Sequence, residues 1–305
     1  MSKETAPLRI ALTGSTGFLG RALTAHLTSA GHRVVPITRR HSGTAADAIA
    51  WNPSRGELQA DALRGFDAVV HLSGENIAQR WSDDVKREIR DSRVKSTALL
   101  ARTIQGMPEP PRVLLSGSAI GIYGDRGDTL LDESSSAGSG FLADVVRAWE
   151  GATSELDRAD VRVTHLRTGV VLDRNGGALE KMLTPFKLGL GGRIGSGRQM
   201  MSWISLSDWT RAVAFIAGAG QLRGAVNLVA PLPVSNADFT HALGTAIGRP
   251  TIVAVPETAI HLMFGEMGDA TILASQRVVP TKLLGAGFRF QHETVADGLR
   301  SALAG

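Results

Sequence analysis

The chain lacks several features that would each point to a class of protein. Its 305 residues include no cysteine, which excludes disulfides, thiolate nucleophiles and cysteine-ligated zinc sites. No apolar run is long enough to cross a bilayer, and residues 1–7 lack the apolar core of a signal peptide. These absences predict a cytoplasmic protein with no membrane partner and no bound metal.

The charge of the chain is spread out rather than concentrated. The net charge is +4, and the basic residues form no dense block, so the sequence predicts no nucleic-acid partner. With 43% hydrophobic and 20% charged residues, the composition is typical of a globular protein with a large core. We expect a small-molecule substrate and a monomer or homodimer.

A glycine-rich turn follows the first predicted strand, Leu8–Leu12, and precedes a segment with helical spacing of apolar residues. The first glycine of such a turn lets the backbone leave the strand sharply, the second lets it approach a pyrophosphate, and the third lets the helix pack closely. Amides at the helix start then face the phosphate. A purely structural turn is the alternative. The pattern predicts a dinucleotide site formed by Gly14, Thr16, Gly17, Phe18, Leu19 and Gly20.

The first half of the chain alternates strand-like and helix-like segments, which predicts an α/β fold with a doubly wound parallel Rossmann-type sheet. One long helix is expected over 82–104, with Ser82 as its N-cap. Glycines then become frequent after Arg167. We expect residues 1–172 to form mainly the NADP-binding domain and 173–305 mainly a smaller C-terminal substrate lobe, with some segments returning to the sheet. Further strands are predicted at 33–37, 68–72, 113–116, 162–166 and 226–229.

The end of the second predicted strand distinguishes the two nicotinamide nucleotides. An acidic residue there would accept a hydrogen bond from the ribose 2′-hydroxyl of NAD, but no carboxylate occurs between Val34 and Ala46. Arg39 and Arg40 stand at this place instead, and forked guanidinium groups suit a 2′-phosphate. The sequence therefore favours NADP(H) over NAD(H), with a solvated arginine pair as the alternative.

Several motifs resemble the extended short-chain dehydrogenase/reductase superfamily, and more narrowly its "epimerase family" branch, often described as nucleoside-diphosphate-sugar epimerases. The resemblance covers nearly the whole chain and implies that cofactor contacts continue beyond the glycine turn, at Leu72, Ser73, Gly74, Glu75, Ser116, Gly117, Arg167 and Gly169. The motifs that carry it are 69–74, 116–124, Trp81 with 92–94, 140–150, 166–172, 197–204 and 264–288.

One departure from the superfamily bears on the reaction. There, a serine or threonine, a tyrosine and a lysine four residues after it share the proton chemistry. Ser118 matches the serine, but the only tyrosine, Tyr123, is followed four residues later by Gly127, and the expected tyrosine region reads Phe141–Val146. The usual Tyr-x-x-x-Lys pair therefore cannot form, while cofactor binding is unaffected.

The remaining polar residues give two hypotheses of function. In the first, the chain is an NADP(H)-dependent oxidoreductase or epimerase-like enzyme acting on a carbonyl or hydroxyl substrate. Ser118 orients the reacting oxygen, and Tyr123 or water carries the proton. In the second, the chain binds NADPH without catalysis, as a sensor or scaffold. Glu75 and Asn76 are placed near the nicotinamide ribose or substrate, whereas His71 is expected to be a core residue. The expected substrate contacts are Asn76, Arg193, Gln199 and Trp203.

Overall fold

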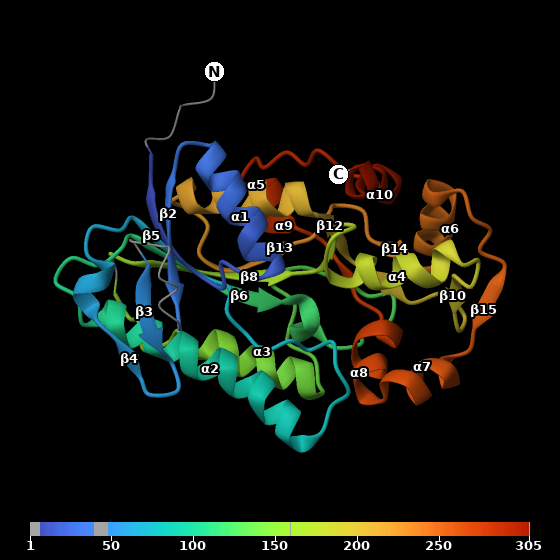
Figure 1. Cartoon of the computed structure of the whole chain (residues 1–305), viewed down its shortest axis with the longest axis horizontal. Coiled ribbons are helices and arrows are strands. Elements are labelled where there is room, and N and C mark those ends of the chain that lie inside the picture. The colour runs from blue at the N-terminus through green and yellow to red at the C-terminus, as the bar shows by residue number, and fades with distance from the viewer. Residues whose placement is uncertain (1–6, 40–47, 159, 305) are drawn as a thin grey trace.

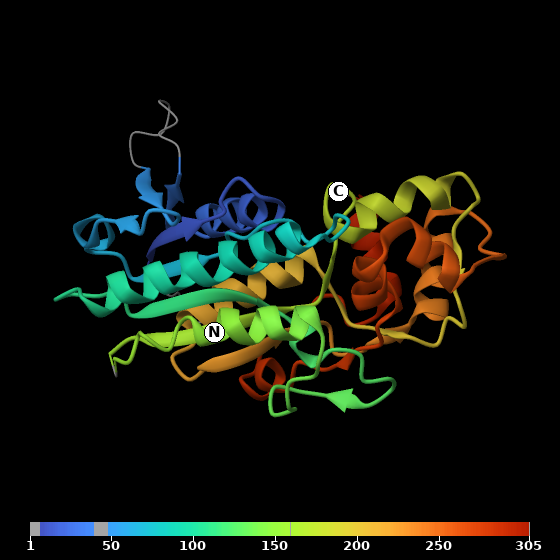
Figure 2. The same cartoon turned by 90° about the horizontal axis from the view of Figure 1, so that it is seen from below.

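The computed structural model describes residues 7–39, 48–158 and 160–304. An eight-stranded sheet lies at its centre, with helices on both faces and a lobe at one end (Figures 1 and 2). All neighbouring strands are parallel except the edge pair β3 and β4. The predicted doubly wound α/β fold is confirmed. In spatial order the strands are β13 (Gly224–Leu228), β8 (Arg162–Thr168), β6 (Val113–Ala119), β5 (Ala68–His71), β1 (Arg9–Thr13), β2 (Arg33–Thr38), β3 (Ile49–Asn52) and β4 (Glu57–Leu58).

Helices cover both faces of the sheet, as Figure 1 shows, with α1 (Phe18–Ser29) and α5 (Leu206–Gly218) on one face and α2 (Asp83–Gln105) and α3 (Phe141–Gly151) on the other. The strands are apolar on both sides because both faces are covered. On β1, Ile10 and Leu12 pack with residues of α1 and α5, whereas Ala11 packs with residues of α2.

The long predicted helix is confirmed as α2. The Ser82 hydroxyl accepts a hydrogen bond from the Val85 amide at 3.3 Å, and Asp83 and Asp84 lie in the first turn. An N-cap and acidic residues at this end stabilise a helix, because its first amides lack partners and carry partial positive charge. Within the described residues, no helix combines the length and apolar character needed to cross a membrane.

The C-terminal lobe has a core of its own, which includes Leu179, Phe186, Phe239 and Leu299. Figure 2 shows this lobe beyond one end of the sheet. α5 and β13 nevertheless return to the sheet, and a domain boundary at residue 172 stays a prediction. The lobe contains α4 (Gly177–Lys187), β10 (Gly192–Ile194), β11 (Met200–Met201), β14 (Val234–Ser235), α6 (Asn236–Ile247), β15 (Val253–Val255), α7 (Glu257–Phe264), α8 (Glu266–Gly268), the π-helical turn η3 (Asp269–Leu273) and α10 (Val295–Ala304). Shorter connecting elements are η1 (Ala60–Leu63), η2 (Ile120–Tyr123), β7 (Leu130–Leu131), β9 (Val170–Leu172), β12 (Trp203–Ser205), β16 (Arg277–Val278) and α9 (Thr281–Gly285).

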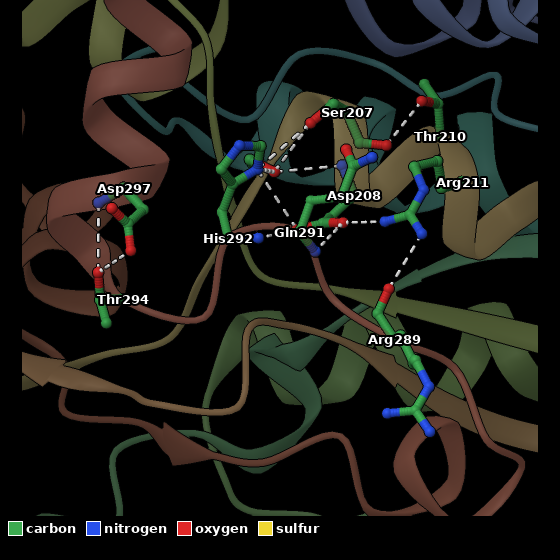
Figure 3. A network of polar contacts seen from close by, with 10 residues as sticks. Ser207, Asp208, Thr210, Arg211, Arg289, Gln291, His292, Thr294 and Asp297 are labelled. Atoms are coloured by element: carbon green, nitrogen blue, oxygen red, sulfur yellow. Dashed lines mark hydrogen bonds and ion pairs between the residues drawn. The ribbon is translucent and has the colours of Figure 1, made fainter.

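A buried carboxylate fastens the C-terminal segment to α5 (Figure 3). Asp208 lies in the first turn of α5 and is fully buried. Its carboxylate accepts hydrogen bonds from the backbone amides of Gln291 and His292, both at 2.9 Å, and from Arg211 Nη1 at 2.5 Å. These charge-assisted bonds hold the approach to α10 against the sheet.

Asp208→Asn is expected to lower the free energy of unfolding by about 1 to 2 kcal/mol, because an amide of the same shape loses the charge in these bonds. Asp297→Asn is the matched control, since Asp297 also accepts hydrogen bonds but from exposed partners, Thr294 and Arg300. Urea unfolding monitored by circular dichroism measures both variants. Equal losses would mean that burial of Asp208 contributes nothing.

Candidate functional site

The glycine turn between β1 and α1 is built so that its first and third glycines are needed. Gly14 has a φ of +70°, and a Cβ there would lie 2.9 Å from the Leu72 carbonyl carbon. The Gly17 amide donates to the Gly14 carbonyl at 3.0 Å, and a side chain at Gly20 would collide with that same oxygen. The backbone can therefore make this close turn only without side chains at Gly14 and Gly20, and a Cβ at Gly17 would lie 3.2 Å from the Gly14 carbonyl oxygen.

The first turn of α1 is open to an anion. Gly17 is its N-cap and provides no side-chain hydrogen bond, and no acidic residue lies in the turn. Thr16 is exposed beside it. Phe18 packs against Gly176, where a side chain would overlap the ring. Helix amides without side-chain partners, together with the helix dipole, favour a phosphate at this position.

Thr13 ties the end of β1 to the end of β5. Its hydroxyl accepts hydrogen bonds from the Leu72 and Ser73 amides, at 3.0 and 3.2 Å, and lies 2.7 Å from His71 Nδ1. Because both hydroxyl lone pairs are used, its proton points to Nδ1, so the other ring nitrogen of His71 donates to Ser96 at 3.0 Å. Burial lowers the pKa of His71 to about 3, so this ring is neutral at physiological pH. The prediction of a core histidine is confirmed.

Three further predicted contacts lie on the same edge of the sheet. Arg39 follows β2, whose Ile37 pairs with Thr13 just before the glycine turn, and its side chain is exposed. Glu75 and Asn76 follow β5 and are also exposed. Arg40 lies outside the described residues. The carboxyl ends of β1, β2 and β5 thus bring these side chains to the place where open α/β sheets bind ligands.

The far half of the edge holds a polar row formed by strand register. Ser118 on β6 is paired with Arg167 on β8, which is paired with Asn227 on β13. Cross-strand partners share a face, and here that face is the one covered by α3. The side chain of Glu150, at the end of α3, reaches this row.

Glu150 joins Ser118 to Arg167. The Ser118 hydroxyl donates to Glu150 Oε1 at 2.6 Å, and Arg167 donates to the two carboxylate oxygens at 2.8 and 2.9 Å. Burial acts to raise the pKa of Glu150, but the hydrogen bonds from Arg167 and Ser118 hold it below its ordinary value. The carboxylate therefore stays ionised at neutral pH, and Ser118, which is 5% exposed, uses its proton but not its oxygen lone pairs in the bond to Glu150.

Tyr123 lies inside this network, which argues against its expected role as a proton carrier. The side chain is fully buried; its hydroxyl donates to Asn227 Oδ1 at 2.8 Å and accepts from Arg167 Nη1 at 3.0 Å. Burial raises the pKa of Tyr123, with Arg167 opposing the rise. A general base needs a pKa near the working pH, so both access and pKa oppose that role. The tyrosine instead positions Arg167.

Four other residues expected to contact a ligand instead pack or form hydrogen bonds inside the protein. Trp203 is fully buried in the lobe core and donates to the Leu232 carbonyl at 3.1 Å, so it is a packing residue and not a substrate contact. Ser116 is fully buried too, and Arg167 is engaged by Glu150 and Tyr123. Gly169 allows a close approach, since a Cβ there would lie 2.6 Å from the Ser202 carbonyl oxygen.

The two remaining substrate candidates lie on the lobe. Arg193 is exposed on β10 and donates to the Gly195 carbonyl at 2.6 Å, and Gln199 donates to the Ile194 carbonyl at 3.3 Å. Their contact with a substrate stays a prediction. A cavity of about 260 Å³ lies elsewhere, against α1, α5 and α10, and includes Ser205, Ser207 and Ser301 in its wall.

Sequence reasoning missed the roles of Thr13 and Glu150. Thr13 directly precedes the glycine turn, and its position next to that motif could have indicated that it lies in the site. Glu150 was recognisable only as the acidic residue at the end of the helix predicted after Phe141, because its partners lie on two separate strands.

Known families match most of the chain. The model of the NAD-dependent epimerase/dehydratase family matches residues 10–228, and a domain of unknown function (DUF1731) matches 255–302. An epimerase family protein of Mycobacterium bovis is 45% identical over 291 residues, which cover 95% of this chain and 96% of the relative. The human epimerase family protein SDR39U1 is 35% identical, covering 97% of this chain and 100% of its own. These matches confirm the resemblance drawn from the motifs.

Solved structures agree with the sequence relatives. The crystal structure of human SDR39U1 (isoform 2) with NADPH has a TM-score of 0.90 at 33% identity, and the match covers 97% of this chain and 99% of that one. A UDP-N-acetylglucosamine 4-epimerase from Bacillus cereus has a TM-score of 0.75 at 17% identity, covering 97% and 96% of the two chains. The second likeness concerns the fold alone.

Proposed function

The chain belongs to the NAD-dependent epimerase/dehydratase family, and from that premise we propose that it binds NADP(H) and acts as an oxidoreductase on a carbonyl or hydroxyl group of a small molecule. The observation that carries the proposal is the glycine turn at Gly14, Gly17 and Gly20, whose backbone leaves no room for a side chain at Gly14 or Gly20 and which leads into an open helix start. The presence of NADPH in the crystal structure of the human relative supports the same assignment.

The residues at the edge of the sheet fit the parts of this cofactor. Gly14, Gly17 and the start of α1 would hold the pyrophosphate. The exposed cation of Arg39, at the end of β2, would pair with the 2′-phosphate. Glu75 would accept a hydrogen bond from the nicotinamide ribose. When bound, NADPH supplies a hydride.

The hydroxyl proton of Ser118 points in one fixed direction in this site. Because its proton is directed to Glu150, its oxygen accepts a hydrogen bond from a substrate hydroxyl and orients the carbon that carries it. Arg167 keeps Glu150 ionised and in place. With Tyr123 inside the network, water is the carrier left for proton exchange with the substrate oxygen.

Arg39→Ala is expected to weaken NADPH binding by about ten- to a hundredfold, the effect of losing a hydrogen bond to a charged group. NADH affinity should not change, since NADH has no 2′-phosphate. Isothermal titration calorimetry measures both nucleotides. Arg64→Ala is the control, because Arg64 is also exposed but precedes β5, at the opposite end of the sheet. Equal weakening of NADPH and NADH would contradict the assignment of Arg39, and a wild-type protein that binds neither would contradict the proposed cofactor.

A non-catalytic NADPH-binding sensor or scaffold is the second candidate, favoured by the missing Tyr-x-x-x-Lys pair and by the burial of Tyr123. Absorbance of the cofactor, measured with NADP and a panel of alcohols whose hydroxyl can donate to Ser118, separates the two. Turnover that Ser118→Ala abolishes supports the enzyme. Tight NADPH binding without turnover, together with a partner captured only when NADPH is present, supports the sensor.

A further inference from the structure

Arg93 on α2 extends its guanidinium beneath the loop that follows β5. A Cβ at Gly74 would lie 3.1 Å from Arg93 Cζ and 3.3 Å from both terminal nitrogens. Arg93 Cζ also lies 5.1 Å from the centre of the Trp149 ring. The guanidinium therefore contacts both the Gly74 backbone and an indole, surroundings that suit its flat, delocalised charge.

Two glycines make room for this stack. Gly74 leaves space for the guanidinium, and Gly117 leaves space for the indole, since a Cβ there would lie 2.8 Å from Trp149 Cζ2. The indole nitrogen donates to Thr97 at 3.0 Å, which fixes the ring. Gly117 directly precedes Ser118, so the stack lies beside the residue proposed to orient the substrate oxygen.

The cation is poorly compensated by the protein. Arg93 Nη1 donates to the Ile89 carbonyl at 2.9 Å, which uses one of five guanidinium donors. Within the described residues, no carboxylate oxygen lies within 4.0 Å of the guanidinium nitrogens, and Ile89 is their only hydrogen-bond acceptor. Burial lowers the pKa of Arg93 to about 10, with Glu75 acting in the opposite direction. Arg93 is partly buried and has no ion pair among the described residues, so its remaining N–H groups can reach a ligand, and an anionic ligand would offset the cost of its partial burial.

We propose that Arg93 is a specificity residue that binds an anionic group, a carboxylate or a phosphate, on the substrate. The inference rests on the proposed function and names the substrate class for that site. We assign this anion to the substrate and not to the pyrophosphate of the cofactor. The glycine turn leads into α1, on one face of the sheet, whereas Arg93 lies on α2, on the other face (Figure 1). Two guanidinium N–H groups would contact the anion side by side, and Ser118 would contact the reacting oxygen.

Inorganic phosphate is the probe, titrated into the NADPH-saturated protein by calorimetry. Saturable binding by the wild type, weakened about ten- to a hundredfold in Arg93→Gln, is expected because the charge-assisted bonds are lost. Arg93→Lys keeps the charge but loses the forked geometry and is expected to fall between the two. Arg102→Gln should bind as the wild type does, because Arg102 lies on the same helix and is exposed, paired with Glu155.

Several results would overturn the inference. No saturable phosphate binding by the wild type, or equal binding by Arg93→Gln, would remove the anion site. If Arg93→Gln weakens NADPH binding tenfold or more while keeping its circular dichroism spectrum, the anion bound by Arg93 belongs to the cofactor. If Arg93→Gln does not fold, the phosphate affinity of Arg93→Lys is compared with that of the wild type, and equal affinities would remove the anion site. Should the wild type fail to bind NADPH, the same phosphate titration on the protein alone still tests Arg93, so the two proposals fail separately.

Discussion

Replacing Glu150 by alanine is expected to lower the free energy of unfolding by about 3 to 5 kcal/mol, because Arg167 would remain in the interior without its partner. The side chains of Arg167 and Glu150 are only 9% and 13% exposed, and two hydrogen bonds join them. Urea unfolding measures the loss. Glu150→Gln should lose less, since it retains an oxygen that accepts a bond from Arg167.

Ser118→Ala is the matched control for this experiment. It removes one of the three hydrogen bonds to the Glu150 carboxylate but leaves the ion pair, so its expected loss is about 1.5 to 3 kcal/mol, that of one hydrogen bond to a charged group. A Glu150→Ala variant no less stable than Ser118→Ala would show that the pair contributes nothing to stability. Such a result would remove the basis for treating Glu150 and Arg167 as the rigid support of Ser118.

Acidification below pH 6.5 is expected to destabilise the protein through His71, by about 1.4 kcal/mol for each pH unit down to about pH 3. The folded pKa of His71 is lowered from 6.5 to about 3 by burial. Between these values the unfolded chain binds a proton that the folded protein does not, so stability is fully present above pH 6.5 and falls as the pH is lowered. Urea unfolding at a series of pH values measures the slope.

His71→Asn is expected to be less stable at pH 7, since the imidazole bonds to Thr13 and Ser96 are lost. Its free energy of unfolding should also fall less steeply as the pH is lowered, because the contribution of His71 is gone. His241→Asn is the control, because His241 is exposed on α6 and its replacement should leave the slope as in the wild type. An unchanged slope in His71→Asn would mean that other groups account for the acid sensitivity.

The cofactor half of the site was predictable because its signals are local. The strand, the glycine turn and α1 follow one another in sequence, and Gly14 and Gly20 are required by backbone contacts within that segment or with the residues directly after β5. The second half was not predictable in this way. Ser118, Arg167 and Asn227 come together only through the register of three strands, which no local pattern specifies.

The roles expected of Tyr123 and Trp203 failed for a related reason. Tyr123 is expected in the site because its loop directly follows the strand carrying Ser118, and Trp203 because it lies near frequent glycines, yet both are fully buried and have hydrogen-bond partners inside the protein. Aromatic residues bury a large apolar area, and their polar atoms need partners when they do so. Residue type alone cannot show whether such a side chain faces a ligand or the core.

The buried carboxylate of Asp208 limits the order in which segments of the chain can fold. Its amide partners, Gln291 and His292, lie 83 and 84 residues further along the chain. Contacts of such long range form late, because the intervening loop must close first. During synthesis from the N-terminus, Asp208 would have Arg211 of α5 as its charge partner but lack its two amide partners until almost the whole chain had emerged. The cofactor-binding sheet is therefore expected to reach its final form only once the last segment before α10 has docked.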